Sequence, residues 1–348
     1  MNNIKDITIR NYRGIRYAEV NGMVRVNVFL GNNNCGKSSV LESVLMLFGA
    51  NSPALPLAVN VNRNYSTVDK NDFALFFHNC DVANVINIEA CLADNSSMRL
   101  DMRYSESMID EIPVSDMQNG MIETLKRYTL NQKYTYGAKE YRTALVYNAK
   151  DSKLSFVPAE ENAKCPSAFY MAPRYNFNDY ISHFNQIVTD KEKAKVVEVL
   201  NSIEPRIKDV TVIGHNVMVD TGLDKLIPIN LMGDGTRKLF TIVTALYNAK
   251  NGILIIDEVD NGLYYKSMKS LWKSILKMSQ EYDIQVFLST HSVDSLNALN
   301  TLLEGEMPEC QSDVKIFTLR KNMQDELKSY DYQFEKFNYL LDREEEIR

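Results

Sequence analysis

One nine-residue stretch, GNNNCGKSS at positions 31–39, restricts the fold of this chain more than any other part of its sequence. It contains G-x-x-x-x-G-K-[ST], in which a loop wraps its backbone N–H groups around phosphates and a side chain at either glycine blocks that approach. Lys37 is expected to reach the β- and γ-phosphates, and the Ser38 hydroxyl to hold Mg²⁺. The predicted nucleotide contacts are Gly31, Asn32, Asn33, Asn34, Cys35, Gly36, Lys37, Ser38 and Ser39.

The flanking sequence supplies the strand and the helix that such a loop requires. Residues 24–30 form a strand-like run that ends at the loop, and apolar residues recur at helical spacing over positions 40–48. The start of that helix adds its positive end to the phosphate site. The pattern therefore predicts a nucleotide-binding protein. Cys35 occupies a position of the loop where many residue types are allowed. It is more simply interpreted as a residue without a special role than as a site of control by oxidation, because thiol reactivity needs an activating environment.

Composition excludes several classes of protein. The 348 residues suffice for one large domain or two, and no apolar run is long enough to span a membrane. The charged N-terminal segment does not resemble a signal peptide, and five scattered cysteines without a C-x-x-C predict reduced thiols in a cytoplasm. A formal charge of −6 argues against a general nucleic-acid coat, although a local basic groove remains compatible with it.

Hydrophobic periodicity predicts an α/β fold in three parts. Residues 1–104 contain a hairpin and the loop, residues 105–165 read as an insertion of uncertain fold, and residues 166–348 complete the main domain. A surface connection is expected over residues 51–71, and a helix over residues 117–128. Apolar strands at residues 252–256 and 284–288, separated by a helix, predict a right-handed crossover in a parallel sheet.

Two of these strands are followed by side chains suited to phosphate chemistry. Asp257 and Glu258 directly follow the first apolar strand, where ligands bind in open α/β sheets. Asp257 is expected to hold Mg²⁺ and Glu258 to polarise the attacking water, whereas the alternative is a carboxylate pair that caps the strand. His291 follows the second strand and is expected to donate to the γ-phosphate, although a lone histidine is more often a satisfied structural residue.

A third stretch, Gly233-Asp234-Gly235, opens the helix that precedes the carboxylate strand. Two glycines at the start of a helix expose N–H groups that can bind phosphate. An ordinary glycine-containing start of a helix explains the spacing equally well.

Together these motifs resemble the ABC-class ATPases of the OLD and RecF type, and in particular the compact AAA-type ATP-binding proteins of bacterial defence loci. The likeness rests on NxRGI at positions 11–15, GNNNCGKSS at 31–39, LMGDGTRKLF at 231–240, ILIIDEVDNGLYY at 253–265 and VFLSTHS at 286–292. It implies an ABC-type P-loop ATPase head with a mixed central sheet, an N-terminal antiparallel β-lobe and an inserted subdomain.

The resemblance also implies how such a head works. Two copies close around two ATP molecules with Mg²⁺, and Gly233, Asp234 and Gly235 of one copy face the γ-phosphate bound by Lys37 of the other. Arg13, in the NxRGI motif, is implied as a further nucleotide contact. The sequence departs from the family where a serine often precedes the signature glycine, and at Tyr264, where a histidine is usual. Both departures concern the rate of ATP hydrolysis and the strength of dimerisation, and not the binding of ATP.

Two functions of different kinds fit this resemblance. The first is a defence ATPase that controls a separate effector, such as a nuclease or toxin. Only about fifty-seven residues follow His291, too few for the Toprim nuclease fused to full-length OLD proteins, so the effector is expected on another chain.

The second function is a RecF- or SMC-like ATPase of DNA maintenance. Its candidate nucleic-acid contacts are Arg10, Arg13, Arg16 and Arg25, for which a solvated face is the commoner explanation. The absence of a long heptad run argues against a coiled-coil arm. A P-loop kinase or nucleotidyl enzyme, a third class, needs an arginine-rich lid and has no use for the Gly233 segment.

Overall fold

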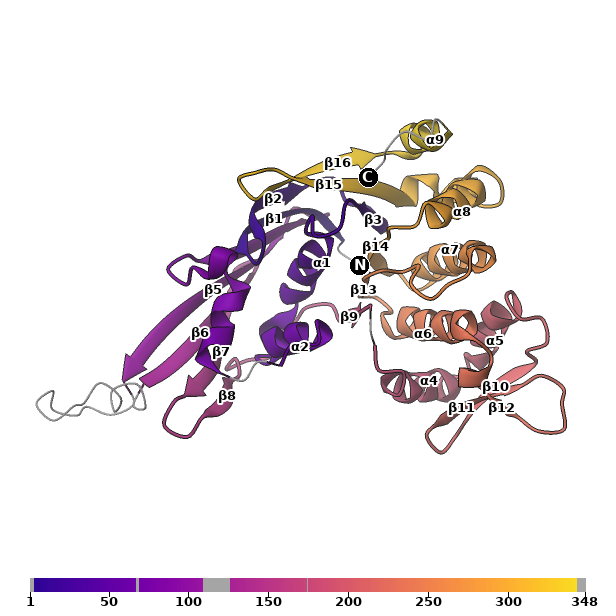
Figure 1. Cartoon of the computed structure of the whole chain (residues 1–348), viewed down its shortest axis with the longest axis horizontal. Helices are drawn as coiled ribbons and strands as arrows, with labels where there is room; N and C mark the ends of the chain where they lie inside the picture. Colours follow the sequence, from indigo (N-terminus) through magenta and orange to yellow (C-terminus); the bar gives the residue numbers. More distant parts are fainter. Residues whose placement is uncertain (1–2, 67–68, 109–125, 174, 343–348) are drawn as a thin grey trace, which may run out of the picture.

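The computed structural model describes the chain except for residues 1–2, 67–68, 109–125, 174 and 343–348 (Figure 1). Its strands are β1 (Ile4–Tyr12), β2 (Ile15–Val20), β3 (Val26–Leu30), β4 (Ile86–Leu92), β5 (Ser97–Met108), β6 (Lys126–Tyr136), β7 (Lys139–Asn148), β8 (Lys153–Val157), β9 (Ala168–Met171), β10 (Asp209–Ile213), β11 (Asn216–Asp220), β12 (Ile227–Pro228), β13 (Ile253–Ile256), β14 (Gln285–Ser289), β15 (Val314–Lys321) and β16 (Glu326–Tyr332). Its α-helices are α1 (Lys37–Met46), α2 (Leu55–Asn62), α4 (Asp179–Thr189), α5 (Lys193–Asn201), α6 (Asp234–Asn248), α7 (Tyr265–Glu281), α8 (Val293–Glu304) and α9 (Phe334–Asp342).

One large mixed sheet organises the described residues, in the order β8-β7-β6-β5-β4-β1-β2-β16-β15-β3-β14-β13-β9. Strands β15, β3, β14, β13 and β9 are parallel to one another, whereas β8 through β2 form an antiparallel arm. Strands β13 and β14 are buried along their whole length, as expected for central parallel strands that are covered on both faces. The mixed sheet and antiparallel lobe expected from the sequence are confirmed.

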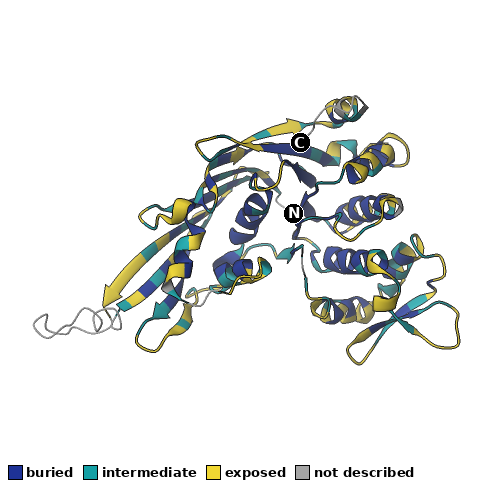
Figure 2. Cartoon of the chain, in the orientation of Figure 1, coloured by how far each residue is buried: buried dark blue, intermediate teal, exposed yellow. Residues whose placement is uncertain are grey.

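Alternation along β3 divides the hydrophobic core between the two faces of the sheet. Val26, Val28 and Leu30 pack with helices α4 to α8 on one face. Phe29 points the other way, into the core formed by α1 and the antiparallel arm. Figure 2 shows buried residues on the inner sides of the helices and exposed residues towards the outside of the molecule. Helix α1 is therefore held between the parallel core and the arm, directly behind the loop that precedes it (Figure 1).

Two expectations for the N-terminal half need correction. Residues 51–71 are not simply a surface connection, because α2 forms there with proline in its first turn and Val59 buried. The helix expected over residues 117–128 lies mostly outside the described residues, and its last three positions belong to β6. The weak, tyrosine-rich signal of residues 126–157 comes from strands β6 to β8, which continue the arm with one solvated face.

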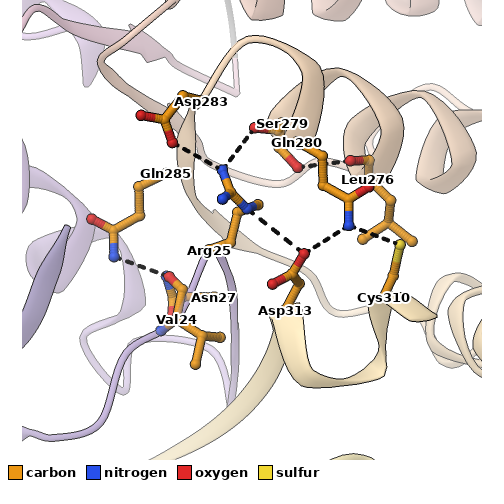
Figure 3. Close-up of polar contacts among 10 residues, drawn as sticks. All are labelled: Val24, Arg25, Asn27, Leu276, Ser279, Gln280, Asp283, Gln285, Cys310 and Asp313. Atoms are coloured by element: carbon orange, nitrogen blue, oxygen red, sulfur yellow. Dashed lines mark hydrogen bonds and ion pairs between the residues drawn. The ribbon is translucent and has the colours of Figure 1, made fainter. Parts of the chain in front are cut away.

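Arg25, just before β3, joins several elements at the end of the sheet opposite the loop between β3 and α1 (Figure 3). Its Nη1 donates to the Ser279 carbonyl oxygen at 3.0 Å and to Asp283 Oδ1 at 3.2 Å, both at the end of α7. Its Nε lies 3.7 Å from Asp313 Oδ2. Arg25 thus serves the fold, at the far end of β3 from the loop. None of the helices in the described residues is long and apolar enough to cross a membrane.

Candidate functional site

The loop between β3 and α1 has the backbone conformation that its glycines allow. Gly31 has φ +140°, and a Cβ there would lie 2.5 Å from the Leu319 carbonyl oxygen and 2.7 Å from Cys35 Sγ. Gly36 has φ +111° and precedes the first residue of α1. Both positions exclude an L side chain, the first through a clash with backbone and both through their dihedral angle. The loop therefore presents its N–H groups and the start of α1 on one side.

Lys37 is held inside this loop. Its Nζ donates to the Gly31 carbonyl oxygen at 2.8 Å and to the Asn32 carbonyl oxygen at 3.0 Å, and the residue is buried. Burial lowers the pKa of Lys37, while Cys35, Asp257 and Glu258 act in the opposite direction. Two carboxylates thus lie within electrostatic range of the ammonium, as the sequence predicted.

Asp257 and Glu258 leave the end of β13 beside the end of β14. Asp257 is buried and accepts a hydrogen bond from Ser289 Oγ at 2.5 Å, while the Glu258 N–H donates to the same Ser289 oxygen at 2.8 Å. Glu258 has φ +54°, a left-handed conformation that costs free energy in a residue with a side chain. Ser289, to which the sequence analysis gave no role, therefore fixes both carboxylate residues against the neighbouring strand.

His291 follows β14 and faces the same space. A cavity of about 500 Å³ lies here, lined by Gly31, Asn32, Asn33, Glu258, Asp260, Asn261 and His291. Burial lowers the pKa of His291, and the nearby Lys37 ammonium lowers it further, so the imidazole is neutral at neutral pH. The structure thus brings together the loop, the carboxylates and the histidine that the sequence singled out.

The oxygen donors of this site suit Mg²⁺. Ser38 is half-buried in the first turn of α1, and Asp257 supplies a carboxylate oxygen beside Lys37. Mg²⁺ prefers such hard oxygen ligands and keeps several waters and phosphate oxygens, so it needs only one or two protein side chains. No cluster of three or more histidine, cysteine or acidic side chains suited to a metal occurs among the residues that the structure describes. The donor set fits a Mg²⁺ ion brought with a nucleotide.

A buried ionic network lies directly behind the loop. Glu42 of α1 is 1% exposed, and its two oxygens pair with Arg13 Nε at 2.7 Å and with Arg63 Nε at 2.5 Å. Arg13 also donates to Asn60 Oδ1 at 2.9 Å, and Arg63 Nη2 lies 3.5 Å from Ser39 Oγ. Arg13 therefore binds Glu42 and Asn60 in this structure, and a contact between Arg13 and nucleotide stays a prediction.

The Gly233 segment lies outside that cavity, at the start of α6. Gly233 has φ +96° with open space around it, and Asp234 pairs with Arg237 at 2.9 Å. Gly235 lies against Leu263 and Ser267, so the start of α6 adjoins the loop between β13 and α7. Beside it lie three exposed apolar side chains: Leu231, Tyr264 and Tyr265, which are 75%, 61% and 52% exposed.

The arginines considered for nucleic-acid binding are engaged within the chain. Arg10 donates to Asn87, Arg16 pairs with Glu326, and Arg25 pairs with Asp283 and Asp313. With Arg13 on Glu42, each of the four has a carboxylate or amide partner of its own. They do not form a free basic groove.

Comparison with known proteins points to the same chemistry. Residues 3–193 match the family model described as AAA ATPase domain, and residues 122–297 match the model described as AAA domain, putative AbiEii toxin, Type IV TA system. A Helicobacter pylori protein named ATP/GTP phosphatase is 22% identical over 378 residues, covering 99% of each chain.

Among solved structures, the chain is similar to an SMC head bound to the C-winged helix domain of ScpA, with a TM-score of 0.51 and 11% identity over 96% of this chain and 98% of that one. It is also similar to an SMC head with an extended coiled coil bound to the C-terminal domain of ScpA, derived from Pyrococcus furiosus. That comparison gives a TM-score of 0.53 and 9% identity over 99% of both chains. At such identities the likeness shows the fold, a P-loop ATPase head.

Proposed function

The chain belongs to the AAA ATPase domain family, and we propose that it binds ATP with Mg²⁺ in the cavity beside Lys37, hydrolyses it, and acts as a dimer-forming nucleotide switch. The observation that carries the proposal is the meeting of three separate segments at one end of the parallel sheet. The loop after β3, Glu258 and Asp260 after β13 and His291 after β14 all line that cavity of about 500 Å³, and Asp257 is buried directly beside Glu258.

Each group has a role that its environment supports. The loop N–H groups bind the phosphates, and the Lys37 ammonium exchanges the carbonyl oxygens of Gly31 and Asn32 for phosphate oxygens. Ser38 and Asp257 hold Mg²⁺, which when bound offsets the negative charge of the phosphates. Glu258 orients and polarises the attacking water, and the neutral His291 donates to the γ-phosphate.

Dimerisation is supported by the surface around the start of α6. Leu231, Tyr264 and Tyr265 place exposed apolar area next to Gly233, whose surroundings are open. Apolar area rimmed by polar residues marks interaction sites. We infer that a second copy covers this surface and brings the N–H groups of Gly233, Asp234 and Gly235 to the γ-phosphate bound by its partner. Closure then depends on a phosphate that hydrolysis removes.

The output of this switch is proposed to be bacterial defence, exerted through a separate effector such as a nuclease or toxin. Support comes from the resemblance to OLD-type ATPases and from the family model whose description includes a putative toxin of a type IV system. We also retain the division into residues 1–104, an inserted segment 105–165 and residues 166–348 as a proposal. The alternative, DNA maintenance, has the SMC-like fold in its favour, while two of its candidate contacts, Arg16 and Arg25, are paired with carboxylates of this chain.

The experiment that separates these outputs is a pull-down of the tagged protein expressed from its native locus with neighbouring genes intact, analysed by mass spectrometry. A stoichiometric partner that separates in ATP supports the defence proposal and identifies the effector. Recovery of the ATPase alone, together with hydrolysis that DNA stimulates, favours DNA maintenance instead. An absence of ATP hydrolysis under both conditions overturns the proposed activity.

A further inference from the structure

A second lysine is buried beside the site, and the proposed mechanism gives it no role. Lys238 lies in the second turn of α6 and is 3% exposed. Its Nζ has no hydrogen-bond partner among the described residues. The ammonium lies 5.3 Å from the centre of the Tyr175 ring, whose hydroxyl is 3.4 Å from Thr241 Oγ1 one turn further along α6. The Tyr175 ring is therefore the clearest favourable contact of the Lys238 ammonium, which has lost its contact with water.

The contrast with Lys37 makes this arrangement unusual. Lys37 is buried to a similar degree, but two backbone carbonyl oxygens accept hydrogen bonds from its ammonium. A buried ammonium without an acceptor is costly, and proteins usually avoid it by supplying a carboxylate. Burial lowers the pKa of Lys238 to about 8, and three carboxylates oppose that shift, first Asp260, then Glu258 and Asp257. The charge thus stands within electrostatic range of the acidic end of β13, with Asp260 acting on it most strongly.

Asp260 belongs to a short loop, residues 258–263, and Thr290 holds it in place in this structure. Its Oδ1 now accepts a hydrogen bond from Thr290 Oγ1 at 2.5 Å, and the residue lines the nucleotide cavity. The loop begins at Glu258 with φ +54°, a strained conformation for a residue with a side chain, and ends its turn at Gly262 with φ +78°, which a glycine adopts without strain. Such a strained loop persists only while its surroundings hold it, and it marks a place where a backbone rearranges. Thr290 holds Asp260 in this structure, whereas the start of α6, the helix that carries Lys238, packs against Leu263 of the same loop and puts the ammonium within electrostatic range of Asp260.

We propose that Lys238 is a positioning residue whose ammonium pairs with the Asp260 carboxylate when loop 258–263 takes its nucleotide-bound arrangement. The pair joins α6, which begins at Gly233, to the loop that carries Glu258. It thereby sets the position of the Glu258 carboxylate relative to the γ-phosphate. This inference rests on the proposed hydrolysis of ATP at this site. It states that the position of α6 affects the position of Glu258 through the Lys238–Asp260 pair.

The test compares Lys238→Met with wild type and with Lys250→Met. Methionine keeps an unbranched chain of similar length without the charge. Lys250 follows the end of the same helix and lies 3.5 Å from the centre of the Tyr247 ring, so it is a matched lysine outside the site. Steady-state hydrolysis of ATP and urea unfolding without nucleotide are measured for each variant.

Lys238→Met is expected to lower kcat by roughly tenfold or more with KM within about twofold, because a positioning residue acts on the reaction more than on binding. The same variant is expected to unfold at a higher urea concentration than wild type, since it removes an unpaired buried charge. Lys250→Met should leave kcat unchanged. A wild-type kcat in Lys238→Met, or a lowered unfolding midpoint, overturns the inference, whereas a wild-type protein that fails to hydrolyse ATP contradicts the proposed function instead.

A double-mutant cycle identifies the partner. If Lys238 acts through Asp260, then Lys238→Met lowers kcat in the wild-type background and has no further effect in an Asp260→Asn background. Independent effects that multiply in the double variant exclude Asp260 as the partner. Lys238→Arg, which keeps the charge, should recover part of the lost kcat, and failure to recover any of it contradicts a role for the charge.

Discussion

Lys37 has two sets of acceptors available to it. In this structure its ammonium donates to the carbonyl oxygens of Gly31 and Asn32, so the loop itself satisfies the charge. Phosphate oxygens carry more negative charge than carbonyl oxygens and make stronger, charge-assisted hydrogen bonds. Nucleotide binding therefore needs an exchange of partners at Lys37 and little movement of the backbone around it.

Lys37→Ala is accordingly expected to abolish ATP binding. It removes the only side-chain cation among the nine residues of the loop, and each hydrogen bond to a charged group typically contributes roughly 1.5–3 kcal/mol. Isothermal titration calorimetry with ATP and Mg²⁺ is the measurement, with thermal unfolding to confirm that the variant is folded. Affinity equal to that of wild type would refute the assignment of the loop.

Glu258→Gln addresses the step after binding. The amide keeps the shape of the side chain and the hydrogen bond from the Glu258 N–H to Ser289 Oγ, but it cannot accept a proton from water. ATP binding should persist while phosphate release falls by roughly 100-fold or more, within the range for general-base catalysis. A phosphate-release assay decides, and release at the wild-type rate would remove Glu258 from this role.

Some residues of the site could be located from sequence motifs, and others could not. The placement of Lys37, Asp257 and His291 at one edge of a parallel sheet was predictable, because a loop with a defined spacing and the ends of apolar strands bring them there. Ser289 and Lys238 carry no such signal, since their importance comes from neighbours far along the chain. Ser289 matters through its hydrogen bond to Asp257, and Lys238 through the proposed pair with Asp260, and a single sequence does not show which distant residues meet.

At the scale of elements, Glu42 links three segments behind the loop. It lies on α1 and pairs with Arg13, between β1 and β2, and with Arg63, just after α2. The network holds α1 at a fixed place between the parallel core and the antiparallel arm, so it also fixes where the loop begins. Residues 51–71 were expected to be only a connection because the stretch is polar and contains proline, and tertiary contacts such as these decide the structure of short helices.

Glu42→Gln tests this link. The substitution keeps the volume of the side chain but leaves the Arg13 guanidinium, 13% exposed, without a buried counter-charge. Removing one partner of a buried pair costs roughly 3 kcal/mol or more, so the urea midpoint should fall markedly.

Glu326→Gln is the matched control, because Glu326 pairs with Arg16 at the surface and such pairs contribute about 1 kcal/mol or less. Equal, small effects of both substitutions would show that the Glu42 network does not hold the elements together.

At the scale of the whole molecule, the nucleotide cavity and the exposed apolar surface lie on neighbouring loops. Loop 258–263 lines the cavity with Asp260 and Asn261 and ends at Tyr264 on the apolar surface. Movement of this loop therefore changes both places together. The long antiparallel arm, by contrast, extends away from α6 and α7 (Figure 1), and Leu231, Tyr264 and Tyr265 are exposed.

ATP-dependent dimerisation through this surface makes a specific prediction. Leu231 is 75% exposed beside Gly233, so Leu231→Glu should prevent the dimer that Glu258→Gln is expected to accumulate with ATP. A charge placed at the centre of a desolvated interface costs several kcal/mol, enough to shift dissociation by roughly 100-fold or more. Met323→Glu is the matched control, because Met323 is fully exposed on the turn between β15 and β16, away from α6.

Sedimentation velocity of the two double variants, each in the Glu258→Gln background with and without ATP, distinguishes the outcomes. We expect a dimer with ATP for Met323→Glu and a monomer for Leu231→Glu, with equal ATP affinity in both. That result ties closure to the surface at the start of α6, because only a contact across that surface makes one exposed apolar residue essential and another dispensable. Dimers of equal stability in both variants would place the interface elsewhere, and the Gly233 segment would then have no route to the γ-phosphate of a partner.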